Sequence, residues 1–498
     1  MTEEMLLEMI KGLTESYFLN QILIILALFL LGLVFLHITD EETGLRRILM
    51  SFPMGLALFS VSGAFLLMVG IPFTPVSAAL TPVLIIFLLF FIKKRWVDLK
   101  EVFVKKELLA LIAVIIIAAI ASSGIFSLNV SNDSVYYYSS FPAMLVEAGA
   151  YAKSFDTYLT NVGQTSAVLN CLPFLYGFDT SFGIQHFMNI NFILIFAEIL
   201  YEDAFELKKS VKTALIAAIA GTFFLASSTP FMIISKWVLS NVYFMDYSFI
   251  LFYLLKRDRE KERGFSFSEF ILFAMVTMIR QEGTVMVLLL IIAASSFEYT
   301  NKRLGLNFVL PVFLMEAFYY LMLFLRLGVD PLYSFLDWKK AVLVLGATAA
   351  VGFYVLVMRG KFLKIIADNI NTVLIIAVAA GNVAILAASH SRYLTNLYTF
   401  YQNIRIGNGW GYFGIFLAIA IVFMALEIII NKFRNISYNT AYIAAMLMTT
   451  IAVAWARGGV LVVRTSDSGN RILLQCIPFV VYTMFTFCSR LCYMNMRK

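Results

Sequence analysis

The sequence carries little charge for its length. Of its 498 residues, 14% are Asp, Glu, Lys or Arg, whereas 61% are hydrophobic, and the mean hydropathy is +0.86. A chain of this composition has more apolar surface than a water-soluble fold can bury, which excludes a soluble globular protein. We therefore expect an integral membrane protein with the lipid bilayer as its solvent.

Cysteine and histidine are also scarce. The sequence contains four cysteines and three histidines, at Cys171, Cys476, Cys488, Cys492, His37, His186 and His390. Their spacing fits neither a metal site nor the disulfide framework of a secreted domain. A glycine-rich loop of the kind that cradles phosphates is absent as well. The sequence therefore predicts no zinc module and no nucleotide-binding loop.

Long apolar runs are abundant, and they recur from Tyr17 to Phe487. About 20 apolar residues cross roughly 30 Å of hydrocarbon. We expect an all-α, polytopic bundle of about 13–15 transmembrane helices. The first run, Tyr17 to His37, is interpreted as a retained span because no small-residue cleavage site follows it. Met1 to Ser16 is expected to form an interfacial amphipathic helix.

The positions of lysine and arginine indicate the topology. Six basic residues lie between Lys93 and Lys106, three between Lys208 and Lys212, and five between Lys256 and Arg263. The positive-inside rule places these loops in the cytoplasm. Alternation of the spans then predicts a cytoplasmic C-terminus, an outer N-terminus and an outer segment from Leu128 to Gly183. The net charge of +7 is interpreted as a record of topology, so no nucleic-acid partner is expected.

Two predicted outer loops carry arginines against this inside bias. Ser389 to Gly409 contains Arg392, and the loop from Arg457 ends at Arg471. They are either ordinary outer loops or they face a phosphate at the membrane surface, because the planar guanidinium pairs well with phosphate oxygens.

One apolar run, Phe265 to Phe297, is interrupted in its middle by polar residues. The interruption consists of Arg280, Gln281, Glu282 and Gly283. We expect two short helices joined by a turn within the membrane, where charged groups are costly unless they pair or face a wet cavity. Two interpretations stay open: an ion pair between Arg280 and Glu282 that stabilises the turn, or a cavity wall near a charged substrate group.

Four segments follow one another in a characteristic order. The first begins at Asp133, continues with Tyr136 and Tyr137, and ends at Gly149; the second begins a span and contains Asp246. A carboxylate at the membrane surface can accept a proton from an incoming hydroxyl. Alternatively, Asp133 is a solvated helix cap, and Asp246 is a polar residue paired within the bundle.

The third segment, Met278 to Thr284, places Arg280 and Gly283 between two short hydrophobic helices, and the fourth places Arg471 before a hydrophobic run and Pro478. In order and in their shared outer side, the four segments resemble the GT-C superfamily of integral-membrane glycosyltransferases. Interfacial snorkelling is the alternative interpretation of Arg471.

The resemblance covers about residues 107–498, which it implies to be the catalytic region, with the outer loop 128–183. Residues 1–106 lie outside it and are interpreted as accessory transmembrane helices. Many members carry two adjacent acids at the start of the outer loop. Asn132 stands at the first of these positions here, so an obligatory divalent metal is not expected.

The resemblance implies an inverting transferase of the polyprenyl-phosphate-sugar-dependent mannosyltransferase or aminoarabinose transferase type. Its donor is a polyprenyl-phosphate sugar, and its acceptor is an envelope glycan, lipid or protein on the outer face, as at a bacterial cell membrane. Asp133 is then the general base, and Asp246 orients the acceptor or supports positive charge. The implied substrate-binding residues are Tyr136, Tyr137, Arg280, Glu282, Arg392 and Arg471.

Two other classes stay open. A transporter or flippase for a lipid-linked saccharide would also have many spans and a broken hydrophobic hairpin, although the chain shows no internal repeat of the kind common in transporters. A noncatalytic envelope-assembly scaffold would tolerate neutralisation of Asp133.

Overall fold

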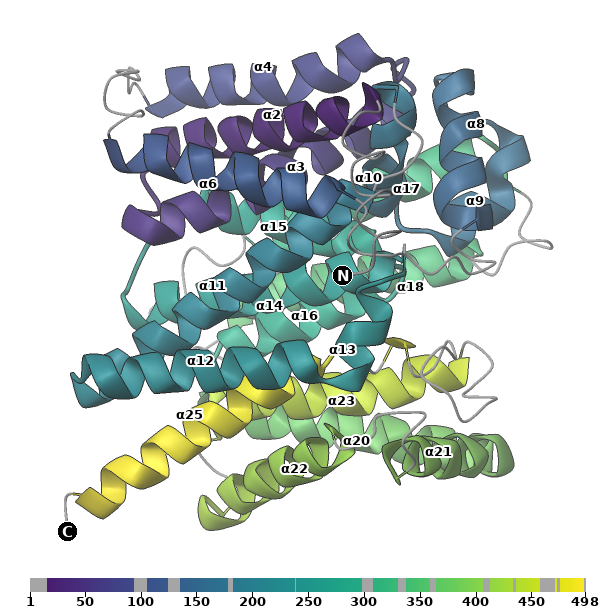
Figure 1. Ribbon diagram of the computed structural model, residues 1–498. Helices are drawn as coiled ribbons and strands as arrows, with labels where there is room; N and C mark the ends of the chain where they lie inside the picture. The colour runs from purple at the N-terminus through teal and green to yellow at the C-terminus, as the bar shows by residue number, and fades with distance from the viewer. Residues whose placement is uncertain are drawn as a thin grey trace.

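The computed structural model of this chain describes residues 16–93, 105–123, 135–177, 182–237, 239–297, 308–329, 337–358, 364–405, 413–432, 436–456, 471–472 and 475–496. These residues fold into an all-α bundle without β-strands (Figure 1). An all-α fold suits the bilayer, because a helix that spans the membrane satisfies its own backbone hydrogen bonds. The predicted interfacial helix lies almost wholly outside the described residues.

Eight of the described helices are long and apolar enough to cross a membrane. They are α2 (Ser16–Thr39), α3 (Gly44–Val69), α4 (Pro75–Lys93), α11 (Phe182–Lys208), α18 (Trp338–Phe353) together with the start of η6 (Tyr354–Met358), α20 (Ile370–Ala388), α22 (Phe413–Ile430) and α23 (Tyr438–Ala456). An integral membrane protein with an all-α polytopic fold is therefore confirmed. The higher number of spans stays a prediction.

Further helices complete the bundle. They are α6 (Lys105–Ser122), α12 (Val211–Ser227), α14 (Ser240–Glu260), α15 (Phe267–Ile279), α16 (Gly283–Ala294), α17 (Leu310–Tyr320) and α25 (Ile477–Met496). The predicted outer segment forms η1 (Tyr136–Ser140), α8 (Phe141–Ala148), η2 (Lys153–Phe155), α9 (Asp156–Asn161) and α10 (Gln164–Leu175). The remaining ones are α13 (Thr229–Ile234), η5 (Leu321–Arg326), η6 (Tyr354–Met358), α19 (Lys364–Asp368) and α21 (His390–Arg405).

The bundle is organised around α14. In Figure 1, α2, α4 and α6 lie together on one side, α20 to α23 and α25 lie on the other, and α14 to α16 lie between them. Every residue of α14 from Ser240 to Arg259 is buried. This helix therefore links the two ends of the molecule through its core.

The N-terminal helices belong to the same core. The α2 and α3 helices cross closely at Gly32 and Gly55, since a Cβ atom on Gly32 would lie 1.8 Å from the Ser51 carbonyl oxygen and one on Gly55 would lie 1.8 Å from that of Leu28. Small residues of this kind let membrane helices approach backbone to backbone. Most of α3 is buried, and it packs against α10, α11, α15 and α17. The predicted division at residue 106 thus runs between helices that share one core.

The interrupted apolar run forms the predicted pair of short helices. The α15 helix ends at Ile279, Arg280 adopts an extended conformation with φ −143° and ψ 158°, and α16 begins at Gly283. A Cβ atom on Gly283 would lie 2.3 Å from the Val276 carbonyl oxygen, so the turn needs glycine for this close approach. At 1.5 Å per residue each helix is roughly 18–20 Å long, shorter than the hydrocarbon layer.

Long-range contacts between the ends of the helices fall into two groups, one at each end of the bundle. Arg257 on α14 pairs with Glu42 at 2.5 Å, and Arg46 on α3 pairs with Glu198 on α11 at 2.7 Å, which joins the connection between α2 and α3 to helices that lead into loops predicted to be cytoplasmic. At the other end of the bundle, the amide of Phe73 donates to the carbonyl of Gly149 at 2.7 Å. The grouping agrees with the predicted alternation of spans. Which group faces the cytoplasm stays a prediction.

Candidate functional site

The predicted site residues are described to different extents. Asp133 lies outside the described residues, and nothing is described of the Tyr136 side chain. Tyr137 lies on η1, where its ring stacks on that of Phe141 at a centroid distance of 6.5 Å. Tyr137 is half-buried in the outer segment.

One hydrogen-bond chain joins parts of all four predicted segments. The Tyr138 hydroxyl lies 2.8 Å from Ser240 Oγ on α14. Arg280 Nη1 donates to Ser240 Oγ at 2.9 Å and to Asn241 Oδ1 at 2.8 Å. Asn241 Nδ2 donates in turn to the carbonyl of Arg471 at 3.0 Å. We call these five residues the Arg280 network.

Arg280 is the centre of this network and is only 8% exposed. Its Nε donates to Glu282, which is 4% exposed. A buried guanidinium and a buried carboxylate are tolerated only when each is paired, because desolvation of either ion alone costs several kcal/mol. The local ion pair predicted for the turn is therefore present. The arginine also reaches beyond it to α14.

The outer segment is clamped onto the same turn. A Cβ atom on Gly163, between α9 and α10, would lie 2.2 Å from the carbonyl oxygen of Met278. One residue into α10, Thr165 Oγ1 donates to the Met275 carbonyl at 3.1 Å. The loop before α10 therefore covers the end of α15, which keeps the predicted outer segment in register with Arg280.

The interior of the outer segment is aromatic. The Tyr158 ring on α9 stacks on that of Phe141 on α8, with centroids 4.8 Å apart. Burial raises the pKa of Tyr158 well above its ordinary value. Tyr158 therefore stays protonated far into alkaline pH.

A small cavity adjoins the Arg280 network. Its volume is about 40 Å³. Its lining comes from the α9–α10 loop, α15, the turn and α17, namely Val162, Gly163, Gln164, Thr277, Met278, Arg280, Gln281, Glu316, Tyr319 and Tyr320. The turn therefore forms a cavity wall as well as an ion pair, so the two interpretations of the sequence are compatible.

Asp246 lies apart from the Arg280 network. It follows Ser240 by six residues and Asn241 by five, which rotates it roughly 120° and 140° away from them around α14. It is fully buried, and its carboxyl oxygens accept no hydrogen bond from the described residues. The structure thus brings Arg280, Glu282 and the backbone of Arg471 together, and it places Asp246 on the opposite face.

The predicted substrate-binding residue Arg392 lies on another element. It belongs to α21, where its guanidinium carbon lies 5.6 Å from the centre of the Trp455 ring, close enough for a cation–π interaction. The α21 helix packs against α20, α22 and α23. This contact joins the first of the two predicted outer loops to the end of α23, just before the second loop begins at Arg457.

Sequence reasoning missed several residues of the site. Tyr138, Ser240 and Asn241 give no local signal, because ordinary polar residues occur at most helix ends. Glu316 did give a local signal, because it is a lone carboxylate in an apolar stretch. An ionisable residue in such a stretch is a candidate functional residue by default. Gln164 opens α10 beside Gly163 and shows its importance only once the cavity is seen.

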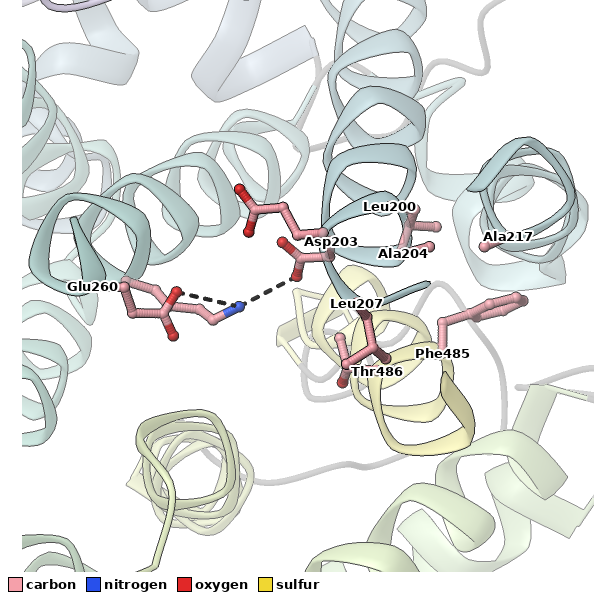
Figure 2. Close-up of a pocket in the computed structure, with 10 residues that line it drawn as sticks. Leu200, Asp203, Ala204, Leu207, Ala217, Glu260, Phe485 and Thr486 are labelled. Atoms are coloured by element: carbon pink, nitrogen blue, oxygen red, sulfur yellow. Dashed lines mark hydrogen bonds and ion pairs between the residues drawn. The ribbon is translucent and has the colours of Figure 1, made fainter. Parts of the chain in front are cut away.

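A larger cavity, of about 280 Å³, lies at the opposite end of α14. Lys256 Nζ there lies 3.2 Å from Asp203 and 4.0 Å from Glu260 (Figure 2). Lys256 also donates to the Tyr482 hydroxyl at 2.7 Å, and that hydroxyl donates to Asp203 at 2.5 Å. Because these groups satisfy one another, we interpret this end as a structural brace between α11, α14 and α25.

The described residues hold no group of three or more His, Cys, Asp or Glu side chains that could bind a metal ion. Comparison with known proteins found no match among family models, curated proteins or solved structures. The four segments and the contacts between them therefore carry the functional argument.

Proposed function

We propose that this protein is a GT-C-like membrane glycosyltransferase that moves a sugar from a polyprenyl-phosphate donor to an acceptor hydroxyl on the outer face of the membrane. The observation that supports the proposal is the Arg280 network, which joins four segments that lie far apart in the sequence. Each of these segments was singled out from the sequence alone.

In the proposed reaction, the acceptor oxygen attacks the anomeric carbon of the donor sugar. The bond from that carbon to the phosphate oxygen breaks, and the electron pair leaves with the polyprenyl phosphate. Asp133 accepts the proton of the acceptor hydroxyl. Attack opposite to the leaving group inverts the anomeric configuration.

The positive groups of the site have a role in the departure of the phosphate. Arg280 is held by Ser240, Asn241 and Glu282, so its position is set before the substrate arrives. Such a preorganised charge offsets the growing negative charge on the leaving group without reorganisation at the moment of reaction. Arg471 is proposed to act at the membrane surface beside it. Asp246 is given no part in this step, because it lies on the opposite face of α14.

A transporter or flippase for a lipid-linked saccharide is the second candidate. The observation that favours it is the pair of short helices around a polar turn, since discontinuous helices form substrate sites in many transporters. The two candidates differ in their product: a transferase breaks the bond between sugar and phosphate, whereas a flippase leaves it intact.

The test is an Asp133→Asn variant in proteoliposomes supplied with a labelled polyprenyl-phosphate sugar and acceptor. Loss of a general base is expected to lower transfer by about 10²- to 10⁴-fold. Asp337→Asn is the matched control, because Asp337 lies outside the four segments and caps α18 by accepting from the Lys340 amide at 2.8 Å. Undiminished transfer by the Asp133 variant would contradict the assignment of the base.

A further inference from the structure

The small cavity beside the Arg280 network contains a carboxylate that the proposed reaction does not use. Glu316 lies on α17 and is 4% exposed. Its Oε1 accepts from the Thr284 hydroxyl at the start of α16. Its Oε2 accepts no hydrogen bond from the described residues, although the Tyr320 phenol lies close to the same carboxylate.

A second buried acceptor faces the same cavity. Gln164 is 1% exposed, and its Nε2 donates to the carbonyls of Leu159 and Val162. Its Oε1 accepts nothing from the described residues. Buried polar atoms without partners are rare in proteins, since each costs about 1–3 kcal/mol. Two of them around one cavity point to a group that enters it.

Two of the three neighbouring hydroxyls are engaged with backbone carbonyls, and the third, the Tyr320 phenol, lies beside the Glu316 carboxylate itself. Thr277 Oγ1 donates to the Phe273 carbonyl at 2.7 Å, and the Tyr319 hydroxyl donates to the Leu159 carbonyl at 2.7 Å. Two acceptor atoms, Glu316 Oε2 and Gln164 Oε1, therefore belong to residues that line the cavity, and a group that donates a hydrogen bond would satisfy one of them. Its volume of about 40 Å³ accommodates a single hydroxyl or one water molecule, which needs roughly 10–15 Å³.

We propose that Glu316 and Gln164 form a hydroxyl subsite that binds one hydroxyl group of the sugar on the lipid-phosphate donor. This inference rests on the proposed function, because it takes the donor sugar as the group next to Arg280. A hydroxyl fits better than an apolar group, since it donates its single proton to the Glu316 carboxylate and its oxygen can accept from the Gln281 side-chain amide, which lines the same cavity. Glu316 is a substrate-binding residue in this proposal, and Gln164 Oε1 is the second acceptor of the subsite.

The experiment measures binding of a polyprenyl-phosphate hexose and its monodeoxy analogues to the purified full chain in lipid nanodiscs. For the wild type, removal of one particular hydroxyl is expected to weaken binding roughly 10- to 100-fold, which is the range for hydrogen bonds to a charged group. The Glu316→Gln variant is expected to bind the intact donor as weakly as the wild type binds that analogue. The Glu316→Gln variant is expected to bind the deoxy analogue with almost the same affinity as it binds the intact donor.

Glu427→Gln is the matched control, because Glu427 also accepts from a threonine hydroxyl, that of Thr440 at 2.5 Å, on helices that do not line the cavity. The control is expected to bind every analogue as the wild type does. Independent, multiplicative losses from the deoxy analogue and the Glu316 variant would overturn the subsite and indicate a structural water instead. Equal losses in the Glu316 and Glu427 variants would also overturn it.

The same samples separate this inference from the proposed function. Hydroxyl-specific binding that depends on Glu316, but without cleavage of the sugar–phosphate bond, would support the subsite and contradict the transferase. Cleavage of that bond by a Glu316→Gln variant with unchanged affinity for every donor would support the transferase and overturn the subsite.

Discussion

Replacement of Arg280 by glutamine perturbs the centre of the Arg280 network, and its effect on stability follows from the contacts. The arginine donates to Ser240, Asn241 and Glu282, and both charged residues are buried. Hydrogen bonds that involve a charged group contribute about 1.5–3 kcal/mol each. Removal of one partner of a buried ion pair costs about 3–5 kcal/mol, because the other charge stays buried without compensation.

We therefore expect Arg280→Gln to lower the free energy of unfolding by about 3–5 kcal/mol. The double variant Arg280→Gln, Glu282→Gln is expected to recover about 1–3 kcal/mol of this loss, since it leaves no buried charge behind. The assay is reversible unfolding of the purified protein in mixed micelles with increasing SDS, followed by tryptophan fluorescence. A double variant whose loss equals the sum of the two single losses would refute the reasoning.

Three further predictions concern other parts of the molecule. Gly163→Ala is expected to lower the free energy of unfolding by about 1–3 kcal/mol through overpacking against α15. Gly346→Ala is the control and is not expected to lower it, because the added Cβ meets nothing within 4 Å. Equal unfolding midpoints for the two variants would contradict this prediction. Burial raises the pKa of Glu41 above its ordinary 4.5, despite its hydrogen bonds from residues 266–268. The folded state then holds the extra proton, so wild type should lose stability relative to Glu41→Gln as pH rises above about 4.5, and parallel stability–pH curves would count against it. Asp246→Asn is expected to leave kcat/KM within about threefold, because Asp246 lies on a different face of α14 from the Arg280 network. A loss of about 10²-fold or more, which is typical of a side chain that takes part in the reaction, would instead support the catalytic role predicted from the sequence.

The fold class follows from composition because few backbone conformations are stable in lipid. Apolar runs of span length must form helices that satisfy their own backbone hydrogen bonds. The broken hairpin was predictable for the same reason, since Arg280 and Glu282 interrupt an apolar run and cannot face lipid. The central position of α3 was not predictable, because its close crossing with α2 depends on which small residues meet across the interface.

The site was predictable in part. Arg280, Glu282 and Arg471 are conspicuous as charged groups near predicted helix ends, and the structure connects Arg280 to Glu282 directly and to the backbone carbonyl of Arg471 through Asn241. Their partners Ser240 and Asn241 are joined to Arg280 by tertiary contacts about 40 residues away in sequence, for which no local pattern exists. The rotation of a helix about its axis depends on all its neighbours. Sequence position alone therefore could not show that Asp246 lies on a different face of α14 from the Arg280 network, and its catalytic role stays a prediction.

The central claim is that the protein breaks the bond between a sugar and a polyprenyl phosphate on the outer face of the membrane. The most direct measurement is mass spectrometry of the lipid products from wild-type proteoliposomes loaded with labelled donor and supplied with acceptor. We expect free polyprenyl phosphate to form in equal amount to glycosylated acceptor, with the anomeric configuration inverted. Movement of the intact donor from one leaflet to the other, with the sugar–phosphate bond unbroken, would contradict the account.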